Sequence, residues 1–419
     1  MANVIFESGT QTQASGLQSG DTLLFETTAP GDVIVTFQPA SGFSIATTTL
    51  TANGQSLTFN ADALLGANLS FFGASGTLDI GGADNDAGLV ASGDDASAAW
   101  GLDGNDTITI DGAGAHVGHG GAGDDSFALG AGTTDGDYTV YGNDGDDGVA
   151  FGAATGNLYV YGGLGEDTLA TGAGNDHIYG NVADPSGTVA DGADSITAGA
   201  GADYVNGNAG DDTIDGGTFS DRLLGGADDD SIIGGAGNDS INGNKGADVI
   251  DGGADDDSLR GGADDDSVSG GTGEDLVRGD LGDDTVSGDG GIDLVFGGDG
   301  DDVFFFAAGD ATSAGVTHDG VTYYDTVGDF TGGDLLDIQG GAFAGEVDYV
   351  TGATFTTVAQ AQVAAAAALT AGNVVAVAVG GDTYLFYNDT FASTTINEVI
   401  KLAGVSDAST ITADDFVVA

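Results

Sequence analysis

The most constraining feature of this chain is an aspartate that recurs in one local context. Eighteen aspartates are each followed two residues later by an apolar residue, as in Asp106-Thr107-Ile108. They are Asp106, Asp125, Asp147, Asp167, Asp176, Asp194, Asp203, Asp212, Asp221, Asp230, Asp239, Asp248, Asp257, Asp266, Asp275, Asp284, Asp293 and Asp302. So short a unit cannot bury its apolar residue alone, but stacked copies share one continuous core. The sequence therefore predicts a solenoid of short strands.

Glycines accompany these aspartates at fixed positions. The segments 234–242 (GGAGNDSIN), 270–278 (GGTGEDLVR) and 297–305 (GGDGDDVFF) share the order glycine, glycine, any residue, glycine, any residue, aspartate, any residue, apolar residue. Glycine is needed where the chain reverses with a positive φ, or where backbone approaches an ion closely. Aspartate supplies a hard carboxylate oxygen and the turn supplies carbonyl oxygens, which together suit Ca²⁺.

These segments resemble the calcium-binding nonapeptide of the repeats-in-toxin (RTX) family. The resemblance implies an all-β fold, a parallel β-solenoid of the kind called a calcium-binding β-roll, in which two nonapeptides make one turn. It also implies that multiple Ca²⁺ ions bind at the turns, with the eighteen aspartates as metal ligands.

The spacing of the aspartates divides the array into two parts. From Asp167 to Asp302 they lie on one nine-residue grid with a single empty position at Pro185, so ion sites are expected along both edges of the solenoid. We interpret residues 183–190 as a loop that replaces one corner without shifting the register. Upstream, the aspartates at 106, 125, 147 and 167 are 19, 22 and 20 residues apart, which predicts one calcium corner per turn. An apolar rhythm continues back through Leu57, so the solenoid is expected to begin at about residue 51 with metal-free turns.

Some corners depart from the glycine pattern. Asp228, Asp255 and Asp264 replace the third glycine, and aspartate tolerates left-handed backbone better than most residues. Phe219 occupies the same position before Asp221 and tolerates it poorly, so we expect that corner to be distorted or its ion to be weakly bound.

Three regions are expected. Residues 1–50 are rich in Thr, Val and Phe, and alternation over 32–38 (DVIVTFQ) predicts strands that form a β cap or an assembly region. Residues 51–305 form the β-solenoid, with calcium repeats from about residue 101. Residues 306–419 form a small C-terminal α+β unit. Its alanine-rich stretch 358–369 predicts a helix, and 373–379 with 383–388 predicts a hairpin turned at residues 380–382.

The charge of the chain makes folding dependent on cations. Sixty-seven acidic residues against five basic ones give a formal net charge of −62, and a polyanion of this density repels itself out of compact states. Because each Ca²⁺ returns two charges, we expect the chain to stay open inside a cell and to fold outside it. Disulfides are excluded because there is no cysteine. The charge also excludes nucleic acid as a partner.

Export is expected to use a C-terminal signal. Residues 1–10 lack the pattern of a signal peptide, and no apolar stretch is long enough to span a membrane. The end of the chain, 414–419 (DDFVVA), is similar to the tails of type I secretion substrates, which implies the type I secretion machinery as a partner. Residues 325–338 resemble the segment that closes the repeat roll of secreted metalloproteases, which implies that Asp325, Asp329, Asp334 and Asp337 cap the last turn and hold a terminal ion.

No catalytic or cofactor-binding residues are predicted, and the chain is not expected to be an enzyme. The four histidines form no HExxH motif. His116 and His119 are three residues apart, which allows zinc chelation, although surface histidines of a metal-free half-turn are the favoured interpretation. Trp100, Tyr138, Tyr141, Tyr159 and Tyr161 either line a sugar platform or, as we favour, form stacked core and ladder contacts.

The sequence thus predicts a secreted, extracellular calcium-binding structural protein. It is expected to associate with the cell surface and to self-assemble as a homo-oligomer, sheet or filament into a surface layer or extracellular fibre. Residues 380–405 are similar to the ends of calcium-dependent surface-layer proteins. The alternative is a secreted RTX adhesin or carbohydrate-binding accessory protein, with a cell-surface glycan as its partner.

Overall fold

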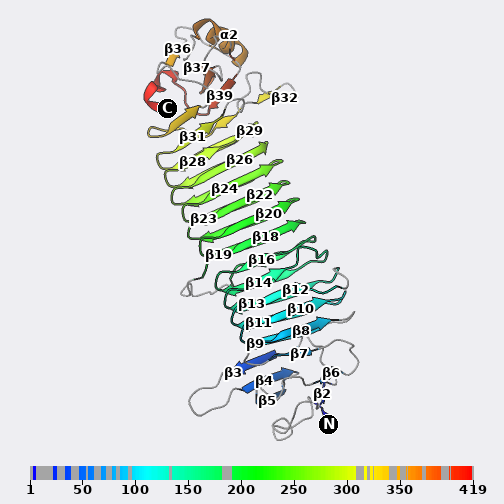
Figure 1. Ribbon diagram of the computed structural model, residues 1–419. Helices are drawn as coiled ribbons and strands as arrows, with labels where there is room; N and C mark the ends of the chain where they lie inside the picture. The colour runs from blue at the N-terminus through cyan, green and yellow to red at the C-terminus, as the bar shows by residue number, and fades with distance from the viewer. Residues whose placement is uncertain are drawn as a thin grey trace. The chain divides into compact units, whose positions relative to one another are not determined.

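The structure is a computed structural model, and it describes two compact units, Met1–Gly216 and Gly217–Ala419. The described residues are 3–5, 22–25, 34–38, 47–52, 55–60, 68–71, 78–81, 85–92, 97–131, 135–181, 191–307, 316–318, 321–323, 325–338, 347–349, 355, 357–369, 374–387, 396 and 398–417. Strands dominate both units (Figure 1). Within these ranges, no helix has the length and apolar character that a membrane crossing needs.

The first unit begins with two small sheets. Strands β1 (Asn3–Ile5), β2 (Thr22–Phe25) and β6 (Asn68–Phe71) pair in parallel, whereas β3 (Ile34–Gln38), β4 (Thr47–Ala52) and β5 (Gln55–Asn60) form an antiparallel meander. The strand expected at 32–38 is confirmed over its described residues 34–38, which form β3. The antiparallel pairing of β4 with β5 departs from the solenoid expected from residue 51, because a regular apolar rhythm does not distinguish a hairpin from a coil.

Parallel coils fill the rest of the first unit, and the chain alternates between two sheets. Sheet A1 contains β8 (Ala87–Ser92), β10 (Thr107–Asp111), β12 (Ser126–Leu129), β14 (Gly148–Ala150), β16 (Thr168–Ala170) and β18 (Ser195–Ala200). Sheet B1 contains β7 (Leu78–Ile80), β9 (Ala98–Asp103), β11 (His116–Ala122), β13 (Tyr138–Asp144), β15 (Tyr159–Leu164), β17 (His177–Tyr179) and β19 (Tyr204–Ala209). Strand β20 (Thr213–Thr218) includes the boundary between the units.

The second unit repeats this plan. Sheet A2 contains β22 (Ser231–Ala236), β24 (Val249–Ala254), β26 (Ser267–Gly273), β28 (Thr285–Ser287), β31 (Val303–Phe306) and β35 (Leu335–Ile338), and the short β29 (Gly290–Gly291) also pairs with β26. Sheet B2 contains β21 (Arg222–Ala227), β23 (Ser240–Lys245), β25 (Ser258–Ala263), β27 (Leu276–Leu281), β30 (Leu294–Asp299) and β34 (Thr326–Val327). The predicted parallel β-solenoid is confirmed.

The apolar residue two places after each aspartate forms the core. Ile108 and Phe127 in the first unit, and Ile250 and Leu259 in the second, have at most 1% of their surface exposed. Parallel pairing places each of them beside its counterpart one coil later, as Ile250 lies opposite Val268. Burying a side chain of this size contributes about 1.5–3 kcal/mol, and the gain recurs in every coil.

The coil that contains residue 185 differs from our expectation. Residues 182–190, and Pro185 with them, lie outside the described part. On either side, β16 pairs with β18 and β17 pairs with β19, so Asp167 is aligned with Asp194 and Asp176 with Asp203. Each of these pairs is 27 residues apart. The extra nonapeptide is therefore inserted into a coil, and the expectation that it replaces a corner without shifting the register was wrong.

The C-terminal segment combines one helix with a hairpin. Helix α2 (Val358–Ala368) begins after the N-cap Thr357, whose side chain accepts from the backbone N–H of Gln360. Strands β37 (Val374–Val379) and β38 (Asp382–Tyr387) pair antiparallel around Gly380, which has a φ of 74°. The predicted helix is confirmed, and so is the hairpin over its described residues 374–387. Buried Ala361 and Ala365 pack on these strands.

The remaining elements attach this segment to sheet B2. Strand β39 (Glu398–Leu402) pairs antiparallel with β38 and parallel with β34, and β36 (Val347–Tyr349) pairs with β37. A small hairpin joins β32 (Val316–His318) to β33 (Val321–Tyr323). Two 3-10 turns, η4 (Ala408–Thr410) and η5 (Ala413–Asp415), end the described chain, and the N–H of Val417 donates to the carbonyl of Leu336.

Candidate metal centre

The repeated aspartates are buried at the corners of the coils and form ladders. The backbone N–H of Asp239 donates to Oδ1 of Asp257 one coil later at 2.8 Å, and the N–H of Asp257 donates in turn to Asp275 at 2.8 Å. The same bond joins Asp106 to Asp125 in the first unit. Each carboxylate therefore satisfies one backbone donor of the preceding coil, which fixes its orientation.

The second carboxylate oxygen, Oδ2, is buried but accepts no hydrogen bond from any described residue. This holds for Asp106, Asp125, Asp147, Asp167, Asp194, Asp239, Asp248, Asp257, Asp266, Asp275, Asp284 and Asp293. A buried oxygen without a donor is costly, and the cost recurs at each of these corners. Such a repeated, uncompensated oxygen is the position expected for a cation ligand.

The first glycine of each repeat leaves the space beside this oxygen open. A Cβ on Gly234 would lie closer than 3.0 Å to both Oδ2 of Asp239 and the carbonyl oxygen of Gly252 in the next coil. A carboxylate oxygen and a carbonyl oxygen from two successive coils therefore converge on the place that a side chain would fill. Gly101 makes the same cradle with Asp106 and Gly120 in the first unit.

The second and third glycines are required by backbone conformation instead. Gly235 and Gly237 have φ values of 107° and 128°, in the region that L-residues rarely adopt. Asp228, Asp255 and Asp264 occupy the third position with φ between 76° and 81°, which agrees with the expected tolerance of aspartate.

The backbone hydrogen bonds of the Asp221 corner are regular, so the corner is not distorted. Phe219 adopts a φ of 76°, and 66% of its surface is exposed. The N–H of Asp221 donates to Asp239 Oδ1 at 2.8 Å, and the Asp221 carbonyl accepts from Ser240 at 2.9 Å, as at other corners. The distortion that we gave as one alternative was wrong, because the positive φ is confined to Phe219 while its side chain is exposed, and a weakly bound ion at this corner stays a prediction.

The ladders hold their carboxylates in an unfavourable environment. Burial raises the pKa of Asp147, Asp194 and Asp293 to about 8, even though a backbone N–H donated to each carboxylate lowers it. Neighbouring aspartates of the same ladder raise it further. Without a cation, these groups hold protons near neutral pH, so a bound divalent ion relieves both burial and repulsion.

The donor set fits Ca²⁺ better than a transition metal. It consists of carboxylate and carbonyl oxygens, which are the hard ligands that Ca²⁺ takes. No group of three or more His, Asp or Glu side chains among the described residues could hold a metal by itself. Backbone carbonyls must therefore supply most of the ligands, and the turns place them at the corners.

The two histidines of β11 point in opposite directions. His116 has 1% of its surface exposed and packs in the core, so the expectation that both are surface histidines was wrong. His119 lies on the outer side, stacked between Trp100 and Tyr141, and burial lowers its pKa to about 3. Residues three apart on a strand face opposite sides, which excludes joint zinc chelation.

The ladders continue beyond the eighteen aspartates at both ends. Asp86 donates its N–H to Asp106 Oδ1 at 2.7 Å, and a Cβ on Gly81 would meet Asp86 Oδ2 and the Gly101 carbonyl. Asp86 was missed because Gly88 is inserted as a bulge before the apolar Leu89, where the pairing register shifts. A glycine preceding an aspartate by five residues was the usable signal.

At the other end, two of the four aspartates proposed to cap the roll extend the ladders. Asp293 donates to Asp325 Oδ1 at 3.1 Å, and Asp302 donates to Asp334 Oδ1 at 3.2 Å. Asp329 accepts instead from the N–H of Gly297 at 3.0 Å. Asp337 lies in β35 opposite Phe305, away from the ladders.

Aromatic rings form a second ladder on the outer side of sheet B1. Trp100, His119, Tyr141, Tyr161 and Tyr179 stack in succession, with centroid separations of 3.5, 4.6, 4.9 and 5.0 Å. Tyr159 stacks on His177 in a parallel row on the same side. Tyr138 is in the core, with 1% of its surface exposed, and does not join this surface. The first four rings lie in coils whose preceding corners lack the calcium motif, whereas Tyr179 follows the corner of Asp176.

Comparison with known proteins agrees with this geometry. A family model described as an RTX calcium-binding nonapeptide repeat (4 copies) matches residues 160–184, 189–223, 215–250, 224–259, 243–277, 251–286 and 278–312. No curated protein matches the chain. RTX nonapeptide repeats bind several calcium ions per repeat region, and proteins that carry them are typically secreted. Residues 160–184 and 189–312 therefore contain RTX calcium-binding nonapeptide repeats.

Proposed function

We propose that the protein is a secreted structural protein that folds on calcium outside the cell and assembles into a surface layer or an extracellular fibre. The observation that carries the calcium dependence is the row of buried Oδ2 atoms facing a carbonyl oxygen of the next coil. Self-assembly is supported by composition, since repeats with no catalytic constellation occupy most of the described chain.

The eighteen aspartates supply one carboxylate ligand each. In the second unit, Oδ1 of Asp257 binds the N–H of Asp239 in the preceding coil, while its Oδ2 lies near the Gly270 carbonyl of the following coil. An ion at this position bridges adjacent coils. Asp86, Asp325 and Asp334 share the ladder geometry and are proposed as additional ligands.

Charge couples ion binding to folding. The chain carries a formal charge of −62, and each bound Ca²⁺ offsets two of these charges at the corner where they are concentrated. Extracellular modules bind calcium with dissociation constants of about 10⁻⁴–10⁻³ M, which leaves them empty inside a cell and filled outside. Export through a type I route, read from residues 414–419, delivers the open chain to calcium.

Each of the three regions of the chain has its own role in this proposal. Residues 1–50 are an assembly region, the solenoid with calcium repeats from about residue 101 is the scaffold, and residues 306–419 cap the roll and carry the export signal. Since residues 306–419 cover one end of the solenoid, assembly is expected through residues 1–50, because an unpaired sheet end is a template for further strand pairing.

Electron microscopy of the purified full chain in about 5 mM CaCl₂ and in excess EDTA tests the proposal. Ordered sheets or filaments are expected only with calcium. Dispersed particles at every calcium concentration would contradict assembly, while calorimetric stability unchanged by EDTA would contradict the calcium proposal separately.

A secreted adhesin or carbohydrate-binding protein is the second candidate, favoured by the aromatic ladder on sheet B1. Rings stacked on each other present their edges outward, whereas sugars pack on ring faces, so the ladder serves stability better than sugar binding. Calorimetric titration with oligosaccharides separates the two. Binding lost in Tyr141→Ala and retained in Tyr138→Phe, a core variant, would favour the adhesin.

A further inference from the structure

Four of the five basic residues of this chain lie on neighbouring strands of one sheet. Arg222, Lys245, Arg260 and Arg278 belong to β21, β23, β25 and β27 of sheet B2, whereas Lys401 belongs to β39 of the C-terminal segment. Sixty-seven acidic residues surround them in the sequence. Two of the five form ion pairs within the chain, Arg260 with Asp280 and Lys401 with Asp382, but these pairs do not require four cations to gather on neighbouring strands of one sheet.

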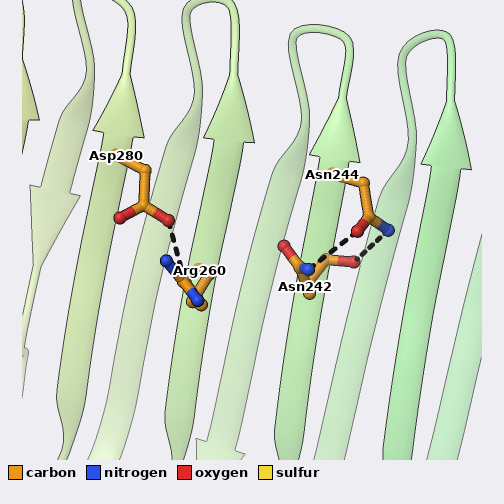
Figure 2. A network of polar contacts seen from close by, with 4 residues as sticks. All are labelled: Asn242, Asn244, Arg260 and Asp280. Carbon is orange, nitrogen blue, oxygen red and sulfur yellow. Dashed lines mark hydrogen bonds and ion pairs between the residues drawn. The ribbon is translucent and has the colours of Figure 1, made fainter.

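Two of these cations are placed directly beside each other. Arg260 and Arg278 are register partners in neighbouring parallel strands, and like charges in that position are unfavourable. Asp280 offsets part of the charge by accepting from Nε of Arg260 at 2.8 Å, and Arg278 lies 4.5 Å from the centroid of the Phe296 ring. Figure 2 shows Arg260 reaching across to Asp280, with Asn242 and Asn244 on the next strand of the face. The Arg260 side chain is still 55% exposed.

Apolar side chains accompany the arginines. Leu281 and Leu294 are 53% and 39% exposed, and Phe296 is half-buried in the same sheet. A surface cavity of about 580 Å³ lies beside Arg260 and Leu281, and its lining also contains Asp280, Asp299 and Asp329, so the cavity itself is acidic. The part of the face outside this cavity, with Arg278, Phe296 and the exposed Leu294, is suited to an acidic, partly apolar partner.

Sheet A2 of the same unit has the complementary character. Its strands contain no lysine or arginine, Ile233 and Val249 are 46% and 55% exposed, and Asp251 is the register partner of Ile233. The carboxylate of Asp251 is complementary in charge to the arginines of sheet B2, and the exposed Ile233 and Val249 are complementary to its exposed leucines. Both faces belong to one solenoid, so their strands have the same spacing of about 4.8 Å, and two copies can match them strand by strand.

We propose that the outer face of sheet B2 docks on the outer face of sheet A2 in a second copy of this chain. The inference rests on the proposed function and specifies its lateral contact. Different faces meet, so the contact is heterologous: each copy keeps one free face of each kind, and association continues into an open array. Arg260 and Arg278 face the Asp251 region, and Leu281 and Leu294 face Ile233 and Val249.

The area sets the strength of this contact. Sheet B2 has five strands of six residues, β21, β23, β25, β27 and β30. With a spacing of about 4.8 Å between strands and about 3.3 Å per residue, they give a face of about 24 by 20 Å. This is smaller than the roughly 800 Å² per partner of a standard stable interface. A single contact is therefore weak, and the array gains strength from repetition.

Sedimentation velocity of the full chain across protein concentrations in about 5 mM CaCl₂ tests the contact. The first variant is Arg278→Glu, and the control is Lys401→Glu, which makes the same charge change at an ion pair with Asp382 in the C-terminal segment. We expect Arg278→Glu to weaken association about 100-fold and Lys401→Glu to leave it near wild type. Calcium-dependent circular dichroism establishes that each variant folds.

A mixing experiment isolates the pairing of faces. The double variant Arg260→Glu/Arg278→Glu removes the docking face on sheet B2 and leaves the face on sheet A2 unchanged. Val249→Glu does the reverse. Each variant alone is expected to stay monomeric, and an equimolar mixture is expected to form dimers and nothing larger. Should Arg278→Glu not fold, the Val249→Glu variant still tests the contact from the other face.

The outcomes separate this inference from the proposed function. Wild-type assembly that Arg278→Glu and Val249→Glu both leave intact overturns the lateral contact and keeps calcium-dependent assembly. Wild type that stays monomeric in calcium overturns both. If the wild type is monomeric and is retained on a polygalacturonate column, and Arg278→Glu is not retained, the partner of sheet B2 is an acidic polysaccharide. That result overturns the proposal that a second copy of this chain binds there.

Discussion

Replacing one ladder aspartate with asparagine should change stability in opposite directions with and without calcium. Asp257 accepts from the N–H of Asp239 through Oδ1, while its Oδ2 is buried beside Gly252 without a described donor. Asparagine keeps the acceptor for the first bond and replaces the second oxygen with an NH₂ group, which cannot ligate a cation. The substitution removes one ion site and leaves the backbone ladder intact.

The magnitude with calcium follows from linkage. A site filled at a free concentration about 100 times its dissociation constant contributes about 2.7 kcal/mol to the free energy of unfolding. We expect Asp257→Asn to lose about that amount in about 10 mM calcium, for a dissociation constant of about 10⁻⁴ M.

In EDTA the sign reverses. Burial raises the pKa of Asp257 to about 7, above the ordinary value of 3.8. A group with a raised pKa binds more protons in the folded state, so the ion-free fold loses stability as pH rises from about 4 through 7. Asparagine carries no charge, so at pH 8 the ion-free variant should be more stable than wild type.

Asp256 provides a control with the same chemistry. It is exposed, and its Oδ1 accepts from the N–H of Glu274 at 2.9 Å. Asp256→Asn removes the same single charge and should shift stability by less than about 0.5 kcal/mol in either buffer. Urea denaturation followed by circular dichroism measures both variants. Equal effects of the two substitutions in calcium would refute the assignment of Asp257 as a ligand.

Three further predictions follow from the corners and the aromatic ladder. Phe219→Gly should raise the free energy of unfolding in calcium by about 1 kcal/mol, because Phe219 holds a φ of 76° with an exposed side chain; a decrease in urea denaturation would contradict this. In calcium-free buffer, acidification from about pH 8 to 4 should increase β-structure by circular dichroism, because burial raises the pKa of Asp147 and Asp293 to about 8 and protonation removes their charge; the opposite trend would refute it. Tyr141→Ala should cost roughly 1–3 kcal/mol, since two stacked contacts are lost, and an equal loss in calcium and in EDTA would distinguish this role from ion binding.

The sequence was a good guide wherever side-chain chemistry alone determines position. An aspartate followed by an apolar residue predicts both a corner and a core contact, because residues two apart on a strand share a face. Asp257 and Leu259 show this, with the carboxylate in the ladder and the leucine fully buried. Helix α2 and the hairpin after it were predictable for the same reason, since local propensity and turn chemistry agree with the packing.

The errors arose where pairing partners decide the structure. Leu57 fits an apolar rhythm, but β5 pairs antiparallel with β4, and rhythm carries no information on strand direction. The nine-residue grid continues through Pro185, yet Asp167 aligns with Asp194, because an inserted nonapeptide and a replaced corner give the same spacing. Only the register between coils separates these alternatives.

The role of the two carboxylate oxygens explains why calcium should act on the whole array. Oδ1 of Asp239 holds the N–H of Asp221 in the coil before it, and Oδ2 lies near the Gly252 carbonyl in the coil after it. Each coil otherwise contacts only its neighbours, so stability is a sum of coil and interface contributions. Because each carboxylate contacts the coil before it and the coil after it, one bound ion stabilises two interfaces between coils. Loss of ions should therefore propagate along the stack, which makes folding sharply dependent on calcium concentration even if every site is weak.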